Sequence, residues 1–242
     1  MTVLRDAFHT LRPLAGDRHG PLAPMMVALT VVTGIVDAAS YLKLGHVFVA
    51  NMTGNVVFLG FALAGAGGLS ATSSLIALGS FLLGARLGGS LVRLHPDHRG
   101  RMLRAVSSVQ AMLMAVALLL ALSANEPFHH DVRYPLTAIL AIAMGAQNAS
   151  AQTVAVPELT TTVLTRTLTG VGAEPGQVRG PNSKLGRRIV AIAAMLLGAL
   201  SGGLLALDVS VAAGLAVAGA IVLAVALCVH LASHRDGVWA PV

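Results

Sequence analysis

Eight apolar segments, separated by short polar stretches, make up most of the chain. About 20 helical residues span the hydrocarbon core of a bilayer, and most of these segments reach that length. The pattern therefore predicts an all-α polytopic membrane protein. The segments fall at about 25–44, 47–66, 72–93, 103–123, 134–156, 159–172, 188–207 and 209–232.

Two of these segments nearly copy each other. Residues 81–91 and 195–205 match at seven of eleven positions. Gly34 and Gly145 form a further matching pair at nearly the same spacing. We therefore expect two membrane repeats that enclose a shared pathway. The predicted divisions are a tail at 1–24, a first repeat at 25–123, an external loop at 124–133, a second repeat at 134–232 and a tail at 233–242.

The positive charges indicate how many segments cross the membrane. Most of the 16 Lys and Arg residues lie in the N-terminal tail or around 93–104 and 173–188, whereas the 67–71 link has none. The positive-inside rule then places both tails and both basic loops in the cytoplasm, so one segment in each half must turn back. The prediction is two inverted repeats with about six crossings plus two re-entrant or broken segments. Eight crossings in two parallel halves is the alternative.

Composition narrows the functional classes. The chain is 55% hydrophobic and 11% charged, where soluble domains carry about 25% charged residues. We attribute the formal net charge of +6 to loops that orient the protein and not to nucleic-acid binding. Cys228 is the single cysteine, so no intramolecular disulfide forms. No nucleotide-binding, metal-binding or nucleophile motif is present, so we expect neither an enzyme nor a cofactor.

The second apolar segment of each half is predicted to be the interrupted one. Residues 159–172 are short, rich in threonine and preceded by Pro157, while 47–66 contains the run from Asn51 to Asn55. Non-helical backbone at membrane depth needs protein or water to satisfy its polar groups. These segments therefore form a hydrated pathway or, alternatively, polar helix contacts. Their candidate pathway residues are Asn51, Thr53, Asn55, Thr161, Thr162 and Thr165.

Asp37 lies deep inside an apolar segment. A carboxylate there costs about 2.5–3.5 kcal/mol on insertion scales, so it must be paired, hydrated or protonated. It is either a coupling group or counter-ion, with Ser40 on the same helical face, or a structural group that caps a broken helix or pairs with Lys43. In the second half Asn148 stands at the equivalent position beside Gln147, which predicts an asymmetric site or interhelical hydrogen bonds.

Two small-residue motifs predict close helix packing. Gly84 and Gly88 are separated by three residues, and so are Gly198 and Gly202 in the second half. Glycines at this spacing let the backbones of two helices approach each other. We interpret all four as packing residues.

Residues 33–42 and 45–55 resemble the YoaK family of bacterial inner-membrane proteins. The second half is similar at 145–149 and 161–165, and the resemblance covers about 25–230. The family is of unknown function and is sometimes labelled a permease. The resemblance implies an integral membrane protein but no substrate. This chain has Thr165-Arg166 where the family tends to show Thr-Gly. The interrupted segment of the second half therefore differs in sequence from that of the first half.

These observations predict a secondary transporter of a small solute across the bacterial inner membrane, coupled to protons or ions through Asp37. The alternatives are a non-transporting membrane subunit or assembly partner, or a passive channel. The expected partners are the lipid bilayer and an unidentified small solute or ion, with no nucleic acid, cofactor or metal. Both termini are expected in the cytoplasm, and a homo-oligomer is left open.

Overall fold

The computed structural model describes residues 2–14, 16–17, 19–159, 165, 167–169, 185–233 and 240, and every regular element within them is helical. This confirms the predicted all-α class. The elements are α1 (Thr2–Leu11), α2 (Leu22–Lys43), α3 (Met52–Leu63), α4 (Ala71–Arg93), α5 (Arg99–Leu122), α6 (His130–Val154), α8 (Leu185–Leu204), a short π-helix η1 (Leu205–Val209) and α9 (Val211–Ala232). Because α6 begins at His130, the predicted loop at 124–133 is shorter than expected.

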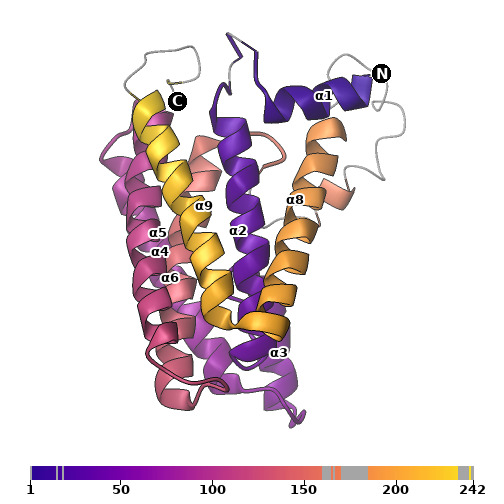
Figure 1. The fold of residues 1–242 in the computed structure, drawn as a ribbon, viewed down its shortest axis with the longest axis vertical. Coiled ribbons are helices and arrows are strands. Elements are labelled where there is room, and N and C mark those ends of the chain that lie inside the picture. The colour runs from indigo at the N-terminus through magenta and orange to yellow at the C-terminus, as the bar shows by residue number, and fades with distance from the viewer. Residues whose placement is uncertain are drawn as a thin grey trace.

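Six of these helices form an upright bundle (Figure 1). Five have the length and apolar character needed to cross a membrane, namely α2, α4, α5, α8 with η1, and α9. The sixth, α6, has 25 residues and a more polar sequence. The protein is therefore a polytopic membrane protein, as predicted.

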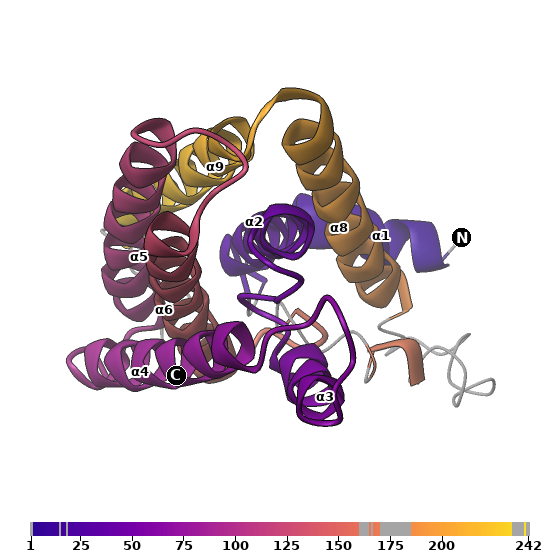
Figure 2. The ribbon, with the colours of Figure 1, turned by 90° about the horizontal axis from the view of Figure 1, so that it is seen from below.

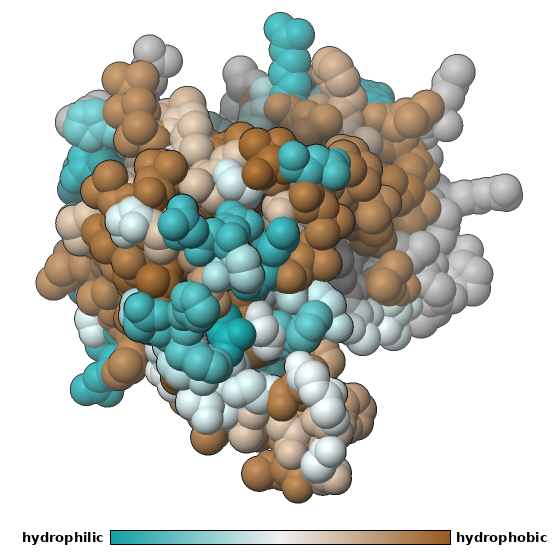
Figure 3. All heavy atoms as spheres, turned by 60° about the horizontal axis from the view of Figure 1, so that its bottom comes forward, coloured by the Kyte–Doolittle hydropathy of each residue, from teal (hydrophilic) through white to brown (hydrophobic). Residues whose placement is uncertain are grey.

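The outer surface of the bundle suits a lipid environment. Large apolar side chains on α4, α8 and α9 are more than half exposed, among them Leu82, Leu196 and Leu227. A soluble monomer rarely exposes so many. Hydrophilic residues instead gather over the end of the bundle opposite the termini (Figure 3). This distribution places the sides of the bundle against lipid and the end opposite the termini in water.

The two halves run in opposite directions. Arg99 contacts both His19, which precedes α2, and the carbonyl of Val154, which ends α6. At the other end, Lys43 at the end of α2 pairs with Glu126, which precedes α6, at 3.7 Å. The start of α2 therefore lies with the end of α6, so these equivalent helices are antiparallel (Figure 1). The repeats are inverted, as the charge distribution predicts.

Helices of one half pack mainly on helices of the other half. Helix α2 packs on α8 of the other half, and α6 packs on α4 (Figure 2). A Cβ on Gly34 would overlap the carbonyl of Met195, and a Cβ on Gly145 would overlap the carbonyl of Phe81. Met195 and Phe81 hold the same position in the repeated segment. The two contacts are therefore equivalent down to the atom.

The remaining packing glycines lie on α4 and α8, the partner helices, and they also make equivalent contacts in the two halves. Gly84 abuts the backbone of Ile142, while Gly198 abuts the backbone of Val31. One turn later, Gly88 lies against Ala146 and Gly202 against Ile35. Any side chain at these four glycines would overlap main-chain atoms that cannot easily move. Helices α5 and α9, the last of each half, pack against one another and complete the bundle.

The first half contains a re-entrant segment. Residues 44–51 are non-helical, and α3 then returns to the end of the bundle at which α2 finished, because α4 starts there after a short loop. Asp37 binds the amides of Val49 and Ala50. Since Asp37 lies six residues before the end of α2, the segment reaches roughly 9 Å back along that helix.

The break does not fall where the sequence predicted it. Asn51 immediately precedes α3, while Gly54 and Asn55 are helical, so the interruption is at 44–51 and not at 51–55. Both Gly54 and Asn55 support the interruption from inside α3. In the second half, most of 159–172 lies outside the described residues, and its residues 165 and 167–169 are helical.

Candidate functional site

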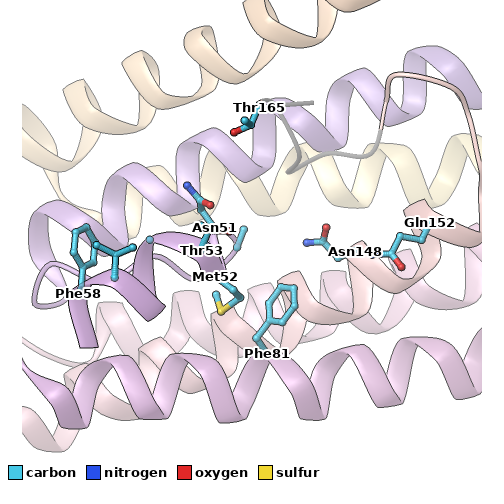
Figure 4. A pocket seen from close by; sticks show the side chains of 11 residues that line it. Asn51, Met52, Thr53, Phe58, Phe81, Asn148, Gln152 and Thr165 are labelled. Carbon is cyan, nitrogen blue, oxygen red and sulfur yellow. The ribbon is translucent and has the colours of Figure 1, made fainter. Parts of the chain in front are cut away.

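A cavity of about 440 Å³ lies where the start of α3 faces the second half of the chain. Figure 4 shows residues from the start of α3 on one side and Asn148 and Gln152 of α6 on the other. The wall thus combines residues of both inverted halves. Its lining residues are Ala50, Asn51, Met52, Thr53, Gly54, Val57, Phe58, Phe81, Asn148, Gln152 and Thr165.

Two buried side chains hold the non-helical backbone that leads into this wall. The amide of Asn55 donates to the carbonyl of Phe48 at 2.6 Å and accepts from its N–H at 2.8 Å. Oδ1 of Asp37 accepts from the N–H groups of Val49 and Ala50 at 2.9 and 2.8 Å. Four backbone groups that a helix would have satisfied are therefore satisfied by side chains, as a break within a membrane requires.

Aromatic packing fixes the same segment from its other side. Phe48 stacks on Tyr41 of α2 and on Phe58 of α3, with ring centroids 5.1 and 5.7 Å apart. A Cβ at Gly54 would lie 2.7 Å from the Phe48 ring. Gly54 is therefore needed for close approach and not for a turn, and Asn55 for its amide. This explains why both residues sit in regular helix although the sequence predicted a break there.

The first turn of α3, from Met52 to Gly54, lines the cavity. Asn51 precedes the helix with φ −91° and makes no capping hydrogen bond through its side chain. The side chains of Asn51 and Thr53 are exposed and line the cavity. A helix N-terminus carries a partial positive charge and orphan N–H donors. This side of the cavity therefore favours a ligand that accepts hydrogen bonds.

The second half contributes neutral polar groups. Asn148 and Gln152 are four residues apart on α6 and so share a face. The Asn148 amide donates to the carbonyl of Met144 at 3.1 Å, which orients its side chain. Thr165 also lines the cavity. Two other predicted pathway residues, Thr161 and Thr162, lie outside the described residues.

Four predicted pathway residues do not line the cavity. Asp37 and Asn55 hold the interrupted segment, as described above. Ser40 donates to the carbonyl of Asp37 at 3.1 Å within its own helix. Gln147 accepts from Gln110 of α5 at 2.6 Å and donates to the Thr33 hydroxyl of α2 at 2.9 Å. Gln147 thus links three helices of both halves, which is the interhelical hydrogen bonding considered as its alternative.

Asp37 takes the capping arrangement and makes no pair with Lys43. The Lys43 ammonium lies 3.7 Å from Glu126 instead. The Asp37 side chain is buried, and its second oxygen, Oδ2, has no hydrogen-bond partner among the described residues. One carboxylate oxygen therefore serves the backbone, and the other makes no hydrogen bond to the described residues.

Sequence reasoning missed several groups. Gln152 could have been found from its spacing to Asn148, whereas Phe58 and Phe81 resemble any other apolar helix residue. Arg99 stands among the basic loop residues in the sequence, yet it is 6% exposed and its Nε donates to the carbonyl of Val154 at 2.9 Å. It caps the end of α6, a role that depends on a contact 55 residues away in the chain.

Comparisons with known proteins agree with this architecture. A family model described as "Protein of unknown function (DUF1275)" matches residues 25–228, which include both halves and the cavity. The UPF0700 transmembrane protein YoaK of Bacillus subtilis (strain 168) is 34% identical over 149 residues, covering 60% of this chain and 63% of that protein. The aligned region thus spans less than two thirds of that relative. No solved structure matches the chain. The chain therefore belongs to the DUF1275 family and is a multi-pass transmembrane protein similar to YoaK.

Proposed function

We propose that the protein is a secondary transporter that moves a small polar solute across the bacterial inner membrane. The observation that carries this proposal is the cavity whose walls come from two oppositely inserted halves. One of these walls contains the end of the non-helical segment and the start of α3. Inverted halves can exchange their conformations, which opens a shared site first to one side and then to the other. The cavity volume of about 440 Å³ suits a small organic solute.

The lining chemistry supports a solute that accepts hydrogen bonds. Asn51, Thr53, Asn148 and Gln152 offer neutral amides and hydroxyls, and α3 offers its N-terminal N–H groups. No described lining residue is charged. A cationic solute would lack a counter-ion here, so a neutral or anionic solute is favoured. Phe58 and Phe81 would contact its apolar part.

Asp37 is the proposed coupling group. Its Oδ1 holds the amides of Val49 and Ala50 directly before the cavity, and its Oδ2 can take a proton without losing a described partner. A protonated carboxyl accepts hydrogen bonds more weakly than a carboxylate. Protonation would therefore loosen the segment that positions Asn51. Proton binding and the shape of the cavity are linked in this way.

The proposed orientation places both termini in the cytoplasm. Most described Lys and Arg residues lie at the end of the bundle that carries the termini, among them Arg93, Arg101 and Arg104. Of the described basic residues, Lys43 and Arg133 lie at the opposite end. This asymmetry follows the positive-inside rule.

Transport is tested with purified protein in liposomes, by electrical recording during rapid addition of panels of neutral and anionic solutes. The proposal expects a response to one chemical class that Asn148→Ala and Gln152→Ala abolish. Thr153→Ala is the matched control, because among the described residues its hydroxyl bonds the carbonyl of Ala149 on the same helix and does not line the cavity. A response that survives both cavity substitutions would place the pathway elsewhere.

The second candidate is a non-transporting membrane subunit. It draws support from Gln110, Gln147 and Thr33, whose buried polar groups are used for packing. This candidate expects a partner that co-purifies at a fixed ratio and no solute response in any liposome. A passive channel would instead conduct without accumulating solute against a gradient.

A further inference from the structure

We infer that α1 is an in-plane helix that binds the lipid surface at the end of the bundle that carries the termini. Its apolar face would enter the boundary of the acyl chains, and its basic face would meet anionic headgroups. This site on the membrane is separate from the cavity and does not depend on the transport proposal.

The sequence of α1 divides into unlike faces. Leu4, Phe8 and Leu11 follow one another at intervals of four and three residues, and they are 80%, 57% and 53% exposed. Another face carries Arg5, which bonds His9 at 3.2 Å across one turn. A short helix with one exposed apolar face and one basic face is typical of helices that lie in the membrane interface.

The helix is held crosswise on the first turn of α8 (Figure 1). Gly186 makes this possible, since a Cβ there would overlap the backbone of Val3 and Ala7. The Asp6 carboxylate accepts from the N–H of Arg187 at 3.0 Å, and it therefore caps α8. The orientation of α1 relative to the membrane-spanning α8 is thus fixed by main-chain contact and by a cap.

The fixed orientation turns the apolar face toward lipid. At about 100° per residue, the face packed on α8 and the exposed apolar face lie roughly 115° apart around α1, and the basic face points away from both. When the basic face points into water, the other two faces are turned toward the membrane. One of them packs on α8, and the exposed apolar face lies beside α8. Ile189 and Leu196 of α8 are exposed apolar residues as well. The occupant of that space beside a membrane-spanning helix is lipid.

Charge supports the same occupant. Arg5 and Arg12 are exposed on and just beyond α1. Asp6, the acidic residue of α1, is committed to the α8 cap. The exposed part of α1 is therefore basic, which suits phosphate-bearing headgroups. A protein partner would need a complementary acidic and apolar surface at the same depth.

The depth of α1 can be measured in the full chain with Cys228→Ser as background. Nitroxide labels at Phe8→Cys and at Arg5→Cys form a matched pair on two faces of one helix. In nanodiscs of phosphatidylcholine with phosphatidylglycerol, collision with oxygen and with a water-soluble nickel chelate is compared by power saturation. We expect a severalfold higher oxygen-to-nickel ratio at Phe8, approaching that of a lipid reference label at Leu82→Cys.

Two results would overturn the inference. A Phe8 label as accessible to nickel as the Arg5 label would place the apolar face in water. A Phe8 label shielded from both reagents would show that protein covers this face. The double variant Arg5→Gln, Arg12→Gln tests the role of charge. With both arginines present, the Phe8 label should lie deeper in nanodiscs that contain phosphatidylglycerol than in nanodiscs without it. In the double variant this difference in depth should disappear. Asp6 and Ala7 stay unchanged in every variant, so the clamp on α8 is kept.

Discussion

The two halves of the molecule share their packing but differ in their polar groups. Gly34 and Gly145 make the same contact on opposite sides of the bundle. Three residues later, one half has Asp37 and the other Asn148, and the buried Gln147 of the second half corresponds to Val36 of the first. The scaffold is therefore symmetric, while the buried and cavity-lining polar groups are not. A symmetric scaffold suits exchange between two states, and an asymmetric site suits a single titrating step.

The largest expected effect comes from breaking the shared packing. Gly34→Leu and Gly145→Leu should each destabilise the fold by about 3 kcal/mol or more, because the added side chain meets fixed main chain. Unfolding in mixed micelles measures this change. Gly79→Leu is the control, since nothing lies within 4 Å of a Cβ there. If one of the two glycines tolerates leucine, their equivalence is wrong.

A smaller loss of stability is expected when the side chain that holds the non-helical segment is removed. Asn55→Ala leaves the N–H and the carbonyl of Phe48 without their partner, which should cost about 2 kcal/mol. Thermal unfolding in detergent measures the loss. Asn51→Ala serves as its control, because the Asn51 side chain makes no capping bond and should leave stability nearly unchanged. Equal losses at both positions would contradict the assigned roles.

Gln147→Val makes the second half resemble the first, where valine occupies the equivalent position. It removes the bonds to Gln110 and Thr33, and we expect a loss of about 1 kcal/mol in unfolding experiments. Solute response should persist, because Gln147 does not line the cavity. Loss of the response in a stable variant would assign Gln147 to the pathway.

Asp37→Asn makes the first half resemble the second and should have the smallest effect on stability, below about 1 kcal/mol, because the amide oxygen still accepts from Val49 and Ala50. The charge is lost while the cap is kept. We expect accumulation driven by a pH gradient to disappear and downhill movement to remain in liposome assays. Full pH-driven accumulation in the variant would remove Asp37 from coupling.

Much of the fold could be predicted because the signals are local or repeated. Apolar segments predicted the helices, basic loops predicted the inverted insertion, and the repeated segments around Gly84 and Gly198 marked the two halves. The exchange of partners between halves could not be predicted, since nothing in either segment says which helix it meets. That information lies in three-dimensional contacts between residues far apart in the chain, from 58 positions for Gly84 and Ile142 to 167 positions for Gly202 and Ile35.

The site was only partly predictable for a related reason. The run from Asn51 to Asn55 correctly marked a re-entrant segment, but sequence placed the break on these residues because Gly and Asn tolerate unusual backbone. Their actual use depends on Phe48, which needs the space at Gly54 and the amide of Asn55. Similarly, Asp37 caps the amides of Val49 and Ala50, which lie 12 and 13 positions further along the chain. No local sequence pattern specifies the turn that brings these residues together.

The most direct test of the account is whether water reaches the cavity between the halves. Asn51→Cys and Gln152→Cys, each in a Cys228→Ser background, are treated in sealed vesicles with a membrane-impermeant maleimide, and Gln147→Cys provides the buried reference. We predict that both cavity positions react from at least one side while position 147 stays unreactive. If both cavity positions stay as unreactive as position 147, the cavity is not hydrated and the proposed pathway is wrong.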